Sequence, residues 1–188
     1  MGDDVILAAR KKAARAAAFV RRRRAFDAHS PNSAAMLLQV LDGCRGVPVA
    51  GYMPINTEID PRPAMANALQ NGPVGVPVIV ATAAPLQFAQ WAPDMAMVKG
   101  AFGAQIPANP RWMVPQIVIV PLVAWDLSGG RLGYGGGFYD RTLQGLRQGG
   151  DVLAIGFAFN VQRDDNLPLE STDQPLDMIV TEDQVIEF

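Results

Sequence analysis

Residues 116–121 read Gln-Ile-Val-Ile-Val-Pro, and residues 129–141 read Gly-Gly-Arg-Leu-Gly-Tyr-Gly-Gly-Gly-Phe-Tyr-Asp-Arg. The first stretch is a continuous β-branched run, typical of a buried strand, and residues 139–147 have the pattern of a helix. The glycines of the second stretch would then lie where a strand gives way to a helix N-terminus. Backbone N–H groups there can face an anion without obstruction from a Cβ atom. The two stretches therefore predict an α/β fold with a phosphate-binding loop.

This glycine-rich segment is neither of the two common nucleotide-binding loops. A Walker loop requires Lys and Ser or Thr after its last glycine, whereas Phe138 and Tyr139 follow Gly137. A dinucleotide-binding fingerprint that begins at Gly133 would require glycine where Phe138 stands. A tight structural turn is the simplest alternative. The flanking Arg131, Tyr134, Tyr139 and Asp140 favour a ligand site instead.

The rest of the chain alternates between strand and helix patterns. We expect helices over residues 4–26, 31–42, 61–70 and 139–147, and strands over 47–52, 76–82, 86–91, 96–98, 116–120, 152–158, 178–180 and 185–187. Residues 107–115 are expected to form an irregular loop. This order predicts one three-layer α/β domain over residues 1–188, with a largely parallel central sheet flanked by helices. Ligands of such sheets bind at the carboxyl ends of the strands.

The composition limits the classes of function. Of 188 residues, 49% are hydrophobic and 18% charged, which is typical of a soluble globular protein. No apolar run approaches the about 20 residues of a membrane span. The single cysteine, Cys44, excludes an intramolecular disulfide and indicates a reducing cytosol. The single histidine, His29, is expected in a loop between helices, so catalysis by a nucleophile and a histidine base is disfavoured.

The charge is unevenly distributed. Eight of the sixteen basic residues lie between Arg10 and Arg24, in the first predicted helix. Lys11 and Arg15 are four residues apart and share one helix face, so both can reach one phosphate. Residues 21–24 are four consecutive arginines that point around most of the helix, and we expect them to form a solvated helix end. A nucleic-acid surface is the alternative.

Further candidates lie in predicted loops. Glu58 follows the first strand, where a glutamate is either solvated or part of a site at the sheet edge. Phe102 lies in a glycine-containing loop and is the best candidate for stacking on a ligand. Asp140 and Asp173 could be an early helical acid and a turn residue. They could equally hold Mg²⁺, which needs only one or two carboxylates when phosphate is bound.

The sequence resembles the 5-formyltetrahydrofolate cyclo-ligase family, also called methenyltetrahydrofolate synthetase, over nearly its whole length. The most specific match is Arg131-Leu-Gly-Tyr-Gly-Gly-Gly-Phe-Tyr-Asp140. It is accompanied, in family order, by Lys-x-x-x-Arg at 11–15, the Glu58 loop, Phe-Gly-x-x-x-Pro at 102–107, Val120-Pro121 and Asp173.

The resemblance implies ATP- and Mg²⁺-dependent conversion of 5-formyltetrahydrofolate to 5,10-methenyltetrahydrofolate, with release of ADP and phosphate through a phosphorylated formyl intermediate. Such a reaction needs positioning and charge neutralisation rather than a protein nucleophile. We also expect a cytoplasmic monomer that acts on small molecules, without nucleic acid or membrane.

The resemblance also assigns residues. The ATP-binding residues would be Lys11, Arg15, Arg131, Gly133, Tyr134, Gly135, Gly136, Gly137, Phe138 and Tyr139. The folate-binding residues would be Met53, Glu58, Phe102, Tyr134, Gly137 and Tyr139, and the Mg²⁺ ligands Asp140 and Asp173. Two positions depart from common family forms. Phe138 replaces a frequent tyrosine and so removes a hydroxyl group. Ile106 replaces a polar residue, and this change affects local substrate contacts.

Two other functions fit parts of the sequence. An ATP- or sugar-phosphate-binding enzyme could use the same fold on another carboxamide or formyl group. An RNA-binding protein could use the arginines at 21–24, with an affinity that falls steeply with salt. The arginine run lacks the interleaved aromatic residues that single-stranded nucleic acids stack on.

Overall fold

The computed structural model describes residues 2–188. Its centre is an eight-stranded sheet in the order β12-β11-β10-β7-β1-β2-β3-β6. The five inner strands from β11 to β2 are parallel. They are β1 (Val49–Ala50), β2 (Val74–Val78), β7 (Ile117–Pro121), β10 (Leu153–Phe157) and β11 (Met178–Val180). Three antiparallel strands complete the edges: β3 (Gln87–Gln90), β6 (Trp112–Met113) and β12 (Val185–Glu187).

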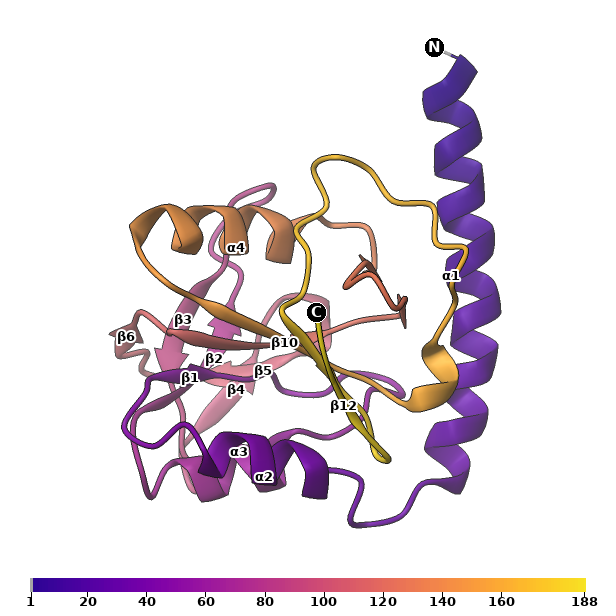
Figure 1. Cartoon of the computed structure of the whole chain (residues 1–188). Coiled ribbons are helices and arrows are strands. Elements are labelled where there is room, and N and C mark those ends of the chain that lie inside the picture. Colours follow the sequence, from indigo (N-terminus) through magenta and orange to yellow (C-terminus); the bar gives the residue numbers. More distant parts are fainter. Residues whose placement is uncertain (1) are drawn as a thin grey trace.

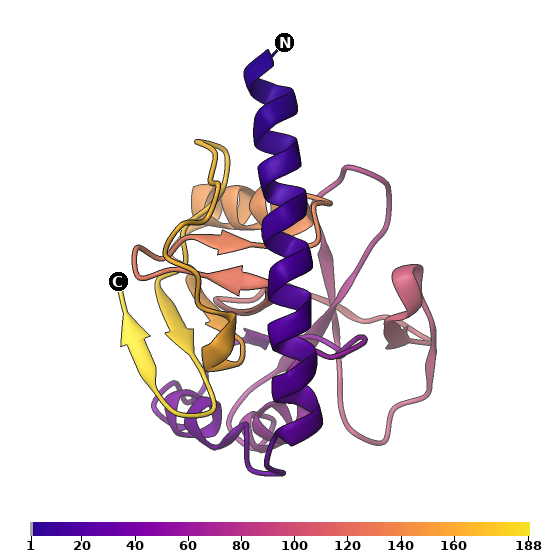
Figure 2. The same ribbon diagram turned by 90° about the vertical axis from the view of Figure 1, so that its right-hand side faces the viewer.

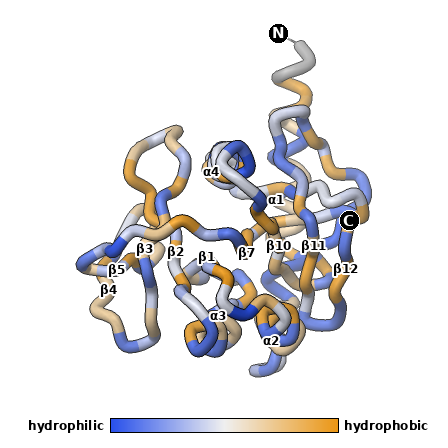
Figure 3. Tube along the Cα trace, turned by 60° about the vertical axis from the view of Figure 1, so that its left-hand side comes forward, coloured by the Kyte–Doolittle hydropathy of each residue, from blue (hydrophilic) through white to orange (hydrophobic). Residues whose placement is uncertain are grey.

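Helices cover both faces of this sheet (Figures 1 and 3). The helices α2 (Ala35–Asp42) and α3 (Arg62–Ala68) lie on one face, and α4 (Phe138–Gly149) lies on the other. The long helix α1 (Gly2–Ala28) runs along one side, and its N-terminal turns extend past the sheet. It contacts the short 3-10 helix η2 (Asn160–Gln162) and the strand β8. The three-layer α/β fold is confirmed.

Strand β7 shows why this sequence makes a central strand. All but the last of its residues are buried. Ile117 and Ile119 pack into the core that includes Leu37 and Met65, from α2 and α3. Val118 and Val120 pack on the opposite side with Leu143 of α4. A parallel strand covered on both faces needs this continuous apolar run, because neither face meets water.

Two small hairpins project from the main sheet. One joins β4 (Met97–Lys99) to β5 (Gln105–Pro107) through the 3-10 turn η1 (Ala101–Gly103). The other joins β8 (Ala124–Trp125) to β9 (Arg131–Leu132). Figure 2 shows α1 running in front of this second hairpin. The hairpin separates β7 from the glycine loop, so the strand that leads into α4 is β9.

The expectation of an irregular loop over residues 107–115 is wrong in part. Trp112 and Met113 form β6, which pairs with β3 and closes one edge of the sheet. A strand of two residues, flanked by Pro110 and Pro115, carries too short a pattern to be recognised, and only its partner strand defines it. No helix within residues 2–188 is long and apolar enough to cross a membrane.

Candidate active site

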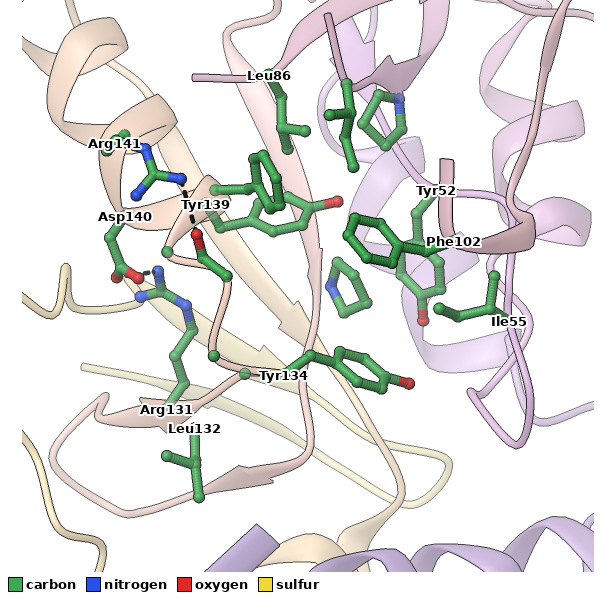
Figure 4. A pocket seen from close by; sticks show the side chains of 18 of the residues that line it. Tyr52, Ile55, Leu86, Phe102, Arg131, Leu132, Tyr134, Tyr139, Asp140 and Arg141 are labelled. Carbon is green, nitrogen blue, oxygen red and sulfur yellow. Dashed lines mark hydrogen bonds and ion pairs between the residues drawn. The ribbon is translucent and has the colours of Figure 1, made fainter. Parts of the chain in front are cut away.

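A cleft of about 1020 Å³ opens at the carboxyl end of the parallel strands. The loop after β1 contributes Met53 and Glu58, and the ends of β2 and β7 contribute Pro77 and Pro121. Helix α1, the hairpin β4–β5 and the glycine loop before α4 form the other walls, and Figure 4 shows part of this lining. This cleft lies at the edge of the sheet where ligands are expected to bind.

The glycine loop, residues 133–137, wraps the start of α4. Gly137 is the N-cap residue of α4, with φ of 63°, and Gly135 has φ of 99°. Both are left-handed conformations that favour glycine. A Cβ atom on Gly137 would also lie 2.6 Å from Nη1 of Arg141. Nη2 of the same arginine donates to the carbonyl of Gly136. Within the described chain, the amides of residues 135–137 donate to no protein acceptor. They are free to bind an anion at the positive end of the helix dipole.

Two cations of α1 line the same cleft, as their spacing predicts. Nε of Arg15 donates to the carbonyl of Gly133 at 2.7 Å. Nζ of Lys11 lies 2.9 Å from Oε1 of Glu170 and 3.1 Å from Oδ2 of Asp173. Burial alone would lower the pKa of Lys11, but the hydrogen bonds and charges of these two acids outweigh it and raise the pKa. Lys11 therefore stays charged beside the loop.

Arg131 and Asp140 form an ion pair beneath the loop. Their nearest atoms, Nη2 and Oδ1, are 2.6 Å apart, and the Arg131 side chain is only 5% exposed (Figure 4). Burial lowers the pKa of Arg131, and the charges of Asp140 and Asp173 oppose that shift. Oδ1 of Asp140 also accepts from the amide of Gln174. Among the described residues, Oδ2 of Asp140 has no hydrogen-bonding partner, so it remains available to the cleft.

These acids fit a magnesium ion that arrives with a nucleotide. Nowhere in residues 5–188 do three Asp, Glu, His or Cys side chains gather closely enough to hold a metal on their own. Magnesium keeps several waters and binds through one or two carboxylates together with substrate phosphates. Asp140 and Asp173 both line the cleft beside the free amides. The donor set therefore suits a phosphate-bound Mg²⁺ better than a resident metal.

The opposite half of the cleft is apolar and aromatic. Phe102 occupies the 3-10 turn η1 with a left-handed φ of 53°, and its side chain is 76% exposed. Its ring lies 6.3 Å from that of Phe138 in an edge-on arrangement. Met53, Ile55 and Ile106 complete this surface. An exposed phenyl ring opposite an apolar wall can stack on a flat heterocycle.

Glu58 lies between the two halves. It is only 5% exposed, so the alternative that it is a solvated loop residue is wrong. Its Oε2 accepts from the amide of Ile55 at 2.8 Å. Burial raises the pKa of Glu58, while hydrogen bonds from Ile55 and Tyr134 and the charge of Arg22 oppose the shift. The hydroxyl of Tyr139 is buried without a hydrogen-bonding partner in the described chain. Two polar groups are thus directed at a site lined by aromatic side chains.

The expectation that arginines 21–24 form a solvated helix end is wrong for half of the run. Arg22 is 1% exposed and hydrogen-bonds Thr57 and Tyr134. Arg21 donates to the carbonyl of Val161 and pairs with Asp164 at 3.4 Å. The two remaining arginines are exposed. The helix packs against the protein along this segment, so one side of it must face inward whatever residue stands there.

The cleft brings together every site residue expected from the sequence: Lys11, Arg15, Met53, Glu58, Phe102, Arg131, Gly133, Tyr134, Gly135, Gly136, Gly137, Phe138, Tyr139, Asp140 and Asp173. Sequence reasoning missed Tyr52, Arg141 and Glu170, which also line it. Arg141 follows the recognised motif directly and could have been included. Tyr52 and Glu170 stand in loops with no distinctive pattern.

The fold and the cleft define a class of protein: a three-layer α/β protein with a cationic, glycine-rich anion site and an adjoining aromatic pocket at the carboxyl edge of its sheet. The sequence model of the 5-formyltetrahydrofolate cyclo-ligase family matches residues 7–182. The chain belongs to this family of enzymes.

Individual relatives agree with this assignment. A protein of Haemophilus influenzae named 5-formyltetrahydrofolate cyclo-ligase is 38% identical over 135 residues, which is 68% of this chain and 72% of the relative. A protein of the same name from Escherichia coli is 35% identical over 147 residues, covering 74% and 80%. The solved structure of 5,10-methenyltetrahydrofolate synthetase from Aquifex aeolicus matches 94% of this chain and 92% of its own, with a TM-score of 0.72 and 26% identity.

Proposed function

We propose that this protein converts 5-formyltetrahydrofolate to 5,10-methenyltetrahydrofolate, using ATP and Mg²⁺ and releasing ADP and phosphate. One observation carries the proposal: a single cleft joins an anion-binding half to an apolar, aromatic half, with a buried carboxylate between them. The reaction needs both halves because a nucleotide and a folate must meet in it.

The triphosphate of ATP fits the half formed by α1 and the glycine loop. The amides of residues 135–137, which donate to no acceptor in the described chain, would supply donors to the phosphates, and Lys11 and Arg15 would add two charges. Phosphate oxygens would compete with Glu170 and Asp173 for Lys11, whose ammonium already pairs with both acids. Bound ATP would thereby free the carboxylate of Asp173 for Mg²⁺. When held by Asp140 and Asp173, this ion would neutralise charge on the transferring phosphoryl group.

The folate fits the other half. The flat pterin ring would stack against Phe102, and Met53 would contact it from the β1–α3 loop. The pterin presents N–H donors along one edge, which a carboxylate can accept in pairs. Glu58 supplies that carboxylate, and the unpartnered hydroxyl of Tyr139 supplies a further polar contact. The apolar Ile106 and Phe138 would contact the ligand without hydrogen bonds.

The two substrates supply the reacting atoms. The oxygen of the formyl group on N5 attacks the γ-phosphorus, and the bond to the bridging oxygen breaks, so ADP leaves. N10 of the folate then attacks the activated formyl carbon and loses its proton to water. The carbon–oxygen bond breaks, phosphate departs with the electron pair, and the methenyl cation remains. The protein orients these groups and stabilises charge, which contributes most of the rate in such transfers.

An assay of methenyl product tests the proposal directly. Folded protein is incubated with 5-formyltetrahydrofolate, with and without ATP and Mg²⁺, and product is followed by its absorbance. We expect turnover only when all three are present. Absence of turnover at saturating ATP, Mg²⁺ and folate would refute the proposal. Gel filtration of the active protein tests the expected monomer, and cell fractionation tests the expected cytoplasmic location.

The RNA-binding alternative loses its main support. Arg22 is buried and Arg21 is held by Val161 and Asp164, so the basic run presents less charge than its sequence suggests.

A further inference from the structure

Arg22 is a buried cation without an ion pair. Its side chain is 1% exposed, and no carboxylate of the described chain lies within salt-bridge distance of it. Its hydrogen-bonding partners are all neutral. Nε donates to Oγ1 of Thr57 at 3.0 Å, Nη2 donates to the hydroxyl of Tyr134 at 2.8 Å, and Nη1 lies 3.5 Å from the carbonyl of Leu122. Burial of a charge costs free energy unless the charge is both paired and hydrogen-bonded, and Arg22 is only hydrogen-bonded.

These partners connect Arg22 to both substrate-binding halves of the cleft. Thr57 directly precedes Glu58 in the β1–α3 loop, and Tyr134 belongs to the glycine loop. The guanidinium also lies 5.5 Å from the centre of the Tyr134 ring and 5.2 Å from that of Phe19. Arg22 itself does not line the cleft. It therefore acts behind the wall, on the residues that form it.

The charge of Arg22 also acts on Glu58. The titratable groups that face Glu58 are Arg22 from α1, Tyr52 after β1, Tyr134 of the glycine loop and Tyr139 of α4. Arg22 is the one cation among them, and its charge lowers the pKa of Glu58 against the effect of burial. Loss of Arg22 would therefore raise the pKa of Glu58 further, and a protonated carboxyl group accepts fewer N–H donors.

We propose that Arg22 is a positioning residue for the folate-binding half of the cleft, holding Tyr134 and the Thr57–Glu58 segment in place through its hydrogen bonds. This inference rests on the proposed function, since it assigns Glu58 to the folate. It predicts that Arg22 serves binding rather than stability. The desolvation cost of a buried charge without an ion pair offsets part of the stability that its three hydrogen bonds contribute.

Three variants separate these roles. Arg22→Met removes both the charge and the hydrogen bonds, Arg22→Lys keeps the charge, and Arg24→Met is the matched control on an exposed turn of the same helix. For Arg22→Met we expect the folate KM to rise by about tenfold or more, which corresponds to the loss of one charged hydrogen bond between Glu58 and the folate. The ATP KM should rise by less, because Arg22 contacts the glycine loop only through Tyr134. The acid limb of kcat/KM for the folate should move to higher pH, and Tm should change little.

Arg22→Lys should restore the position of the acid limb while recovering the folate KM only in part. Thr57→Val keeps the charge of Arg22 and the hydroxyl of Tyr134 and removes the hydrogen bond from Nε of Arg22, so it should raise the folate KM without moving the acid limb. Arg24→Met should match wild type throughout. An unchanged folate KM and pH profile in Arg22→Met would overturn the proposal. A rise of both KM values by the same factor, together with a lower kcat and a lower Tm, would also overturn it. Such a result would show that Arg22 has only a structural role.

Amide hydrogen exchange tests the inference without turnover. In the ligand-free protein, Arg22→Met should increase exchange in residues 55–59 and 133–137, and Arg24→Met should not. Unchanged exchange in both segments would overturn the positioning role even if the enzyme is active. Absence of turnover in wild type would instead refute the proposed function, and the exchange result would still decide whether Arg22 holds the two loops.

Discussion

Asp140→Asn removes one negative charge at the start of α4 and preserves the shape of the side chain. Oδ1 of Asp140 lies 2.6 Å from the guanidinium of Arg131, and the two side chains are 30% and 5% exposed. Removing one partner of a fully buried pair costs about 3–5 kcal/mol. Water reaches Asp140 and reduces that cost, so we expect a loss of about 2 kcal/mol. For a protein of this length Tm should fall by about 6 °C.

The same change should affect catalysis separately. Oδ2 of Asp140 has no partner among the described residues, and Asp140 lines the cleft that we assign to the phosphates. Asn cannot supply the charge that a hard cation requires. If Asp140 holds Mg²⁺, kcat should fall on the order of 10²-fold, as when one preorganised electrostatic group is removed. Higher Mg²⁺ should recover part of the rate.

Asp177→Asn is the matched control. Asp177 pairs with Arg147 at 3.0 Å near the other end of α4, outside the cleft, with side chains 41% and 24% exposed. Its loss should lower Tm and leave kcat unchanged. The assay measures kcat against Mg²⁺ concentration for both variants at saturating ATP and folate, alongside thermal unfolding. If Asp140→Asn keeps the wild-type kcat at every Mg²⁺ concentration while Tm falls, Asp140 is only the partner of Arg131 and our reasoning is refuted.

Three further changes give independent tests. Arg15→Ala should raise the ATP KM by roughly tenfold or more through loss of a charged hydrogen bond to phosphate; initial rates that leave this KM unchanged would remove Arg15 from the site. Gly137→Ala forces a left-handed residue and displaces Arg141, so urea unfolding should show a loss of at least about 1 kcal/mol, accompanied by a higher ATP KM. Burial raises the pKa of Glu58, so the folded protein holds this proton above the pH at which the unfolded chain releases it, and stability from this group falls as pH rises through that window. Glu58→Gln should therefore flatten the dependence of Tm on acid pH, and an unaltered curve would contradict the burial effect.

The elements with strong patterns could be predicted from the sequence, and those defined by a partner could not. Residues 116–120 and 139–147 were recognised because an uninterrupted apolar run and a helical period are local properties. The hairpin of β8 and β9 has two residues in each strand, and its pairing depends on contacts with α1 that no window of sequence contains. The position of the glycine loop before α4 was correct, but the strand that leads into it was not.

The candidate site was predictable where a motif places its residues next to one another. The glycine loop, Arg131 and Asp140 lie within ten positions, so their chemistry is visible before their geometry. Glu58 was harder, because a loop glutamate has no local signal of burial. Tyr52, Tyr134 and Tyr139 surround it, and the last two come from the glycine-rich segment, which is far from Glu58 in the sequence.

The helical period of α1 indicates that Arg22 faces the protein. Lys11, Arg15, Ala18 and Arg22 are spaced by four, three and four residues, which places them on one stripe of α1. Ala18 is fully buried, and the first two residues line the cleft, so the stripe faces the protein along its length. Four consecutive arginines are typical of a solvated helix end, whereas the helical period places Arg22 alone among them on the inward stripe. An inward-facing Ala18 therefore predicts that Arg22, four residues later, is directed at the protein behind the wall of the site and not at the solvent.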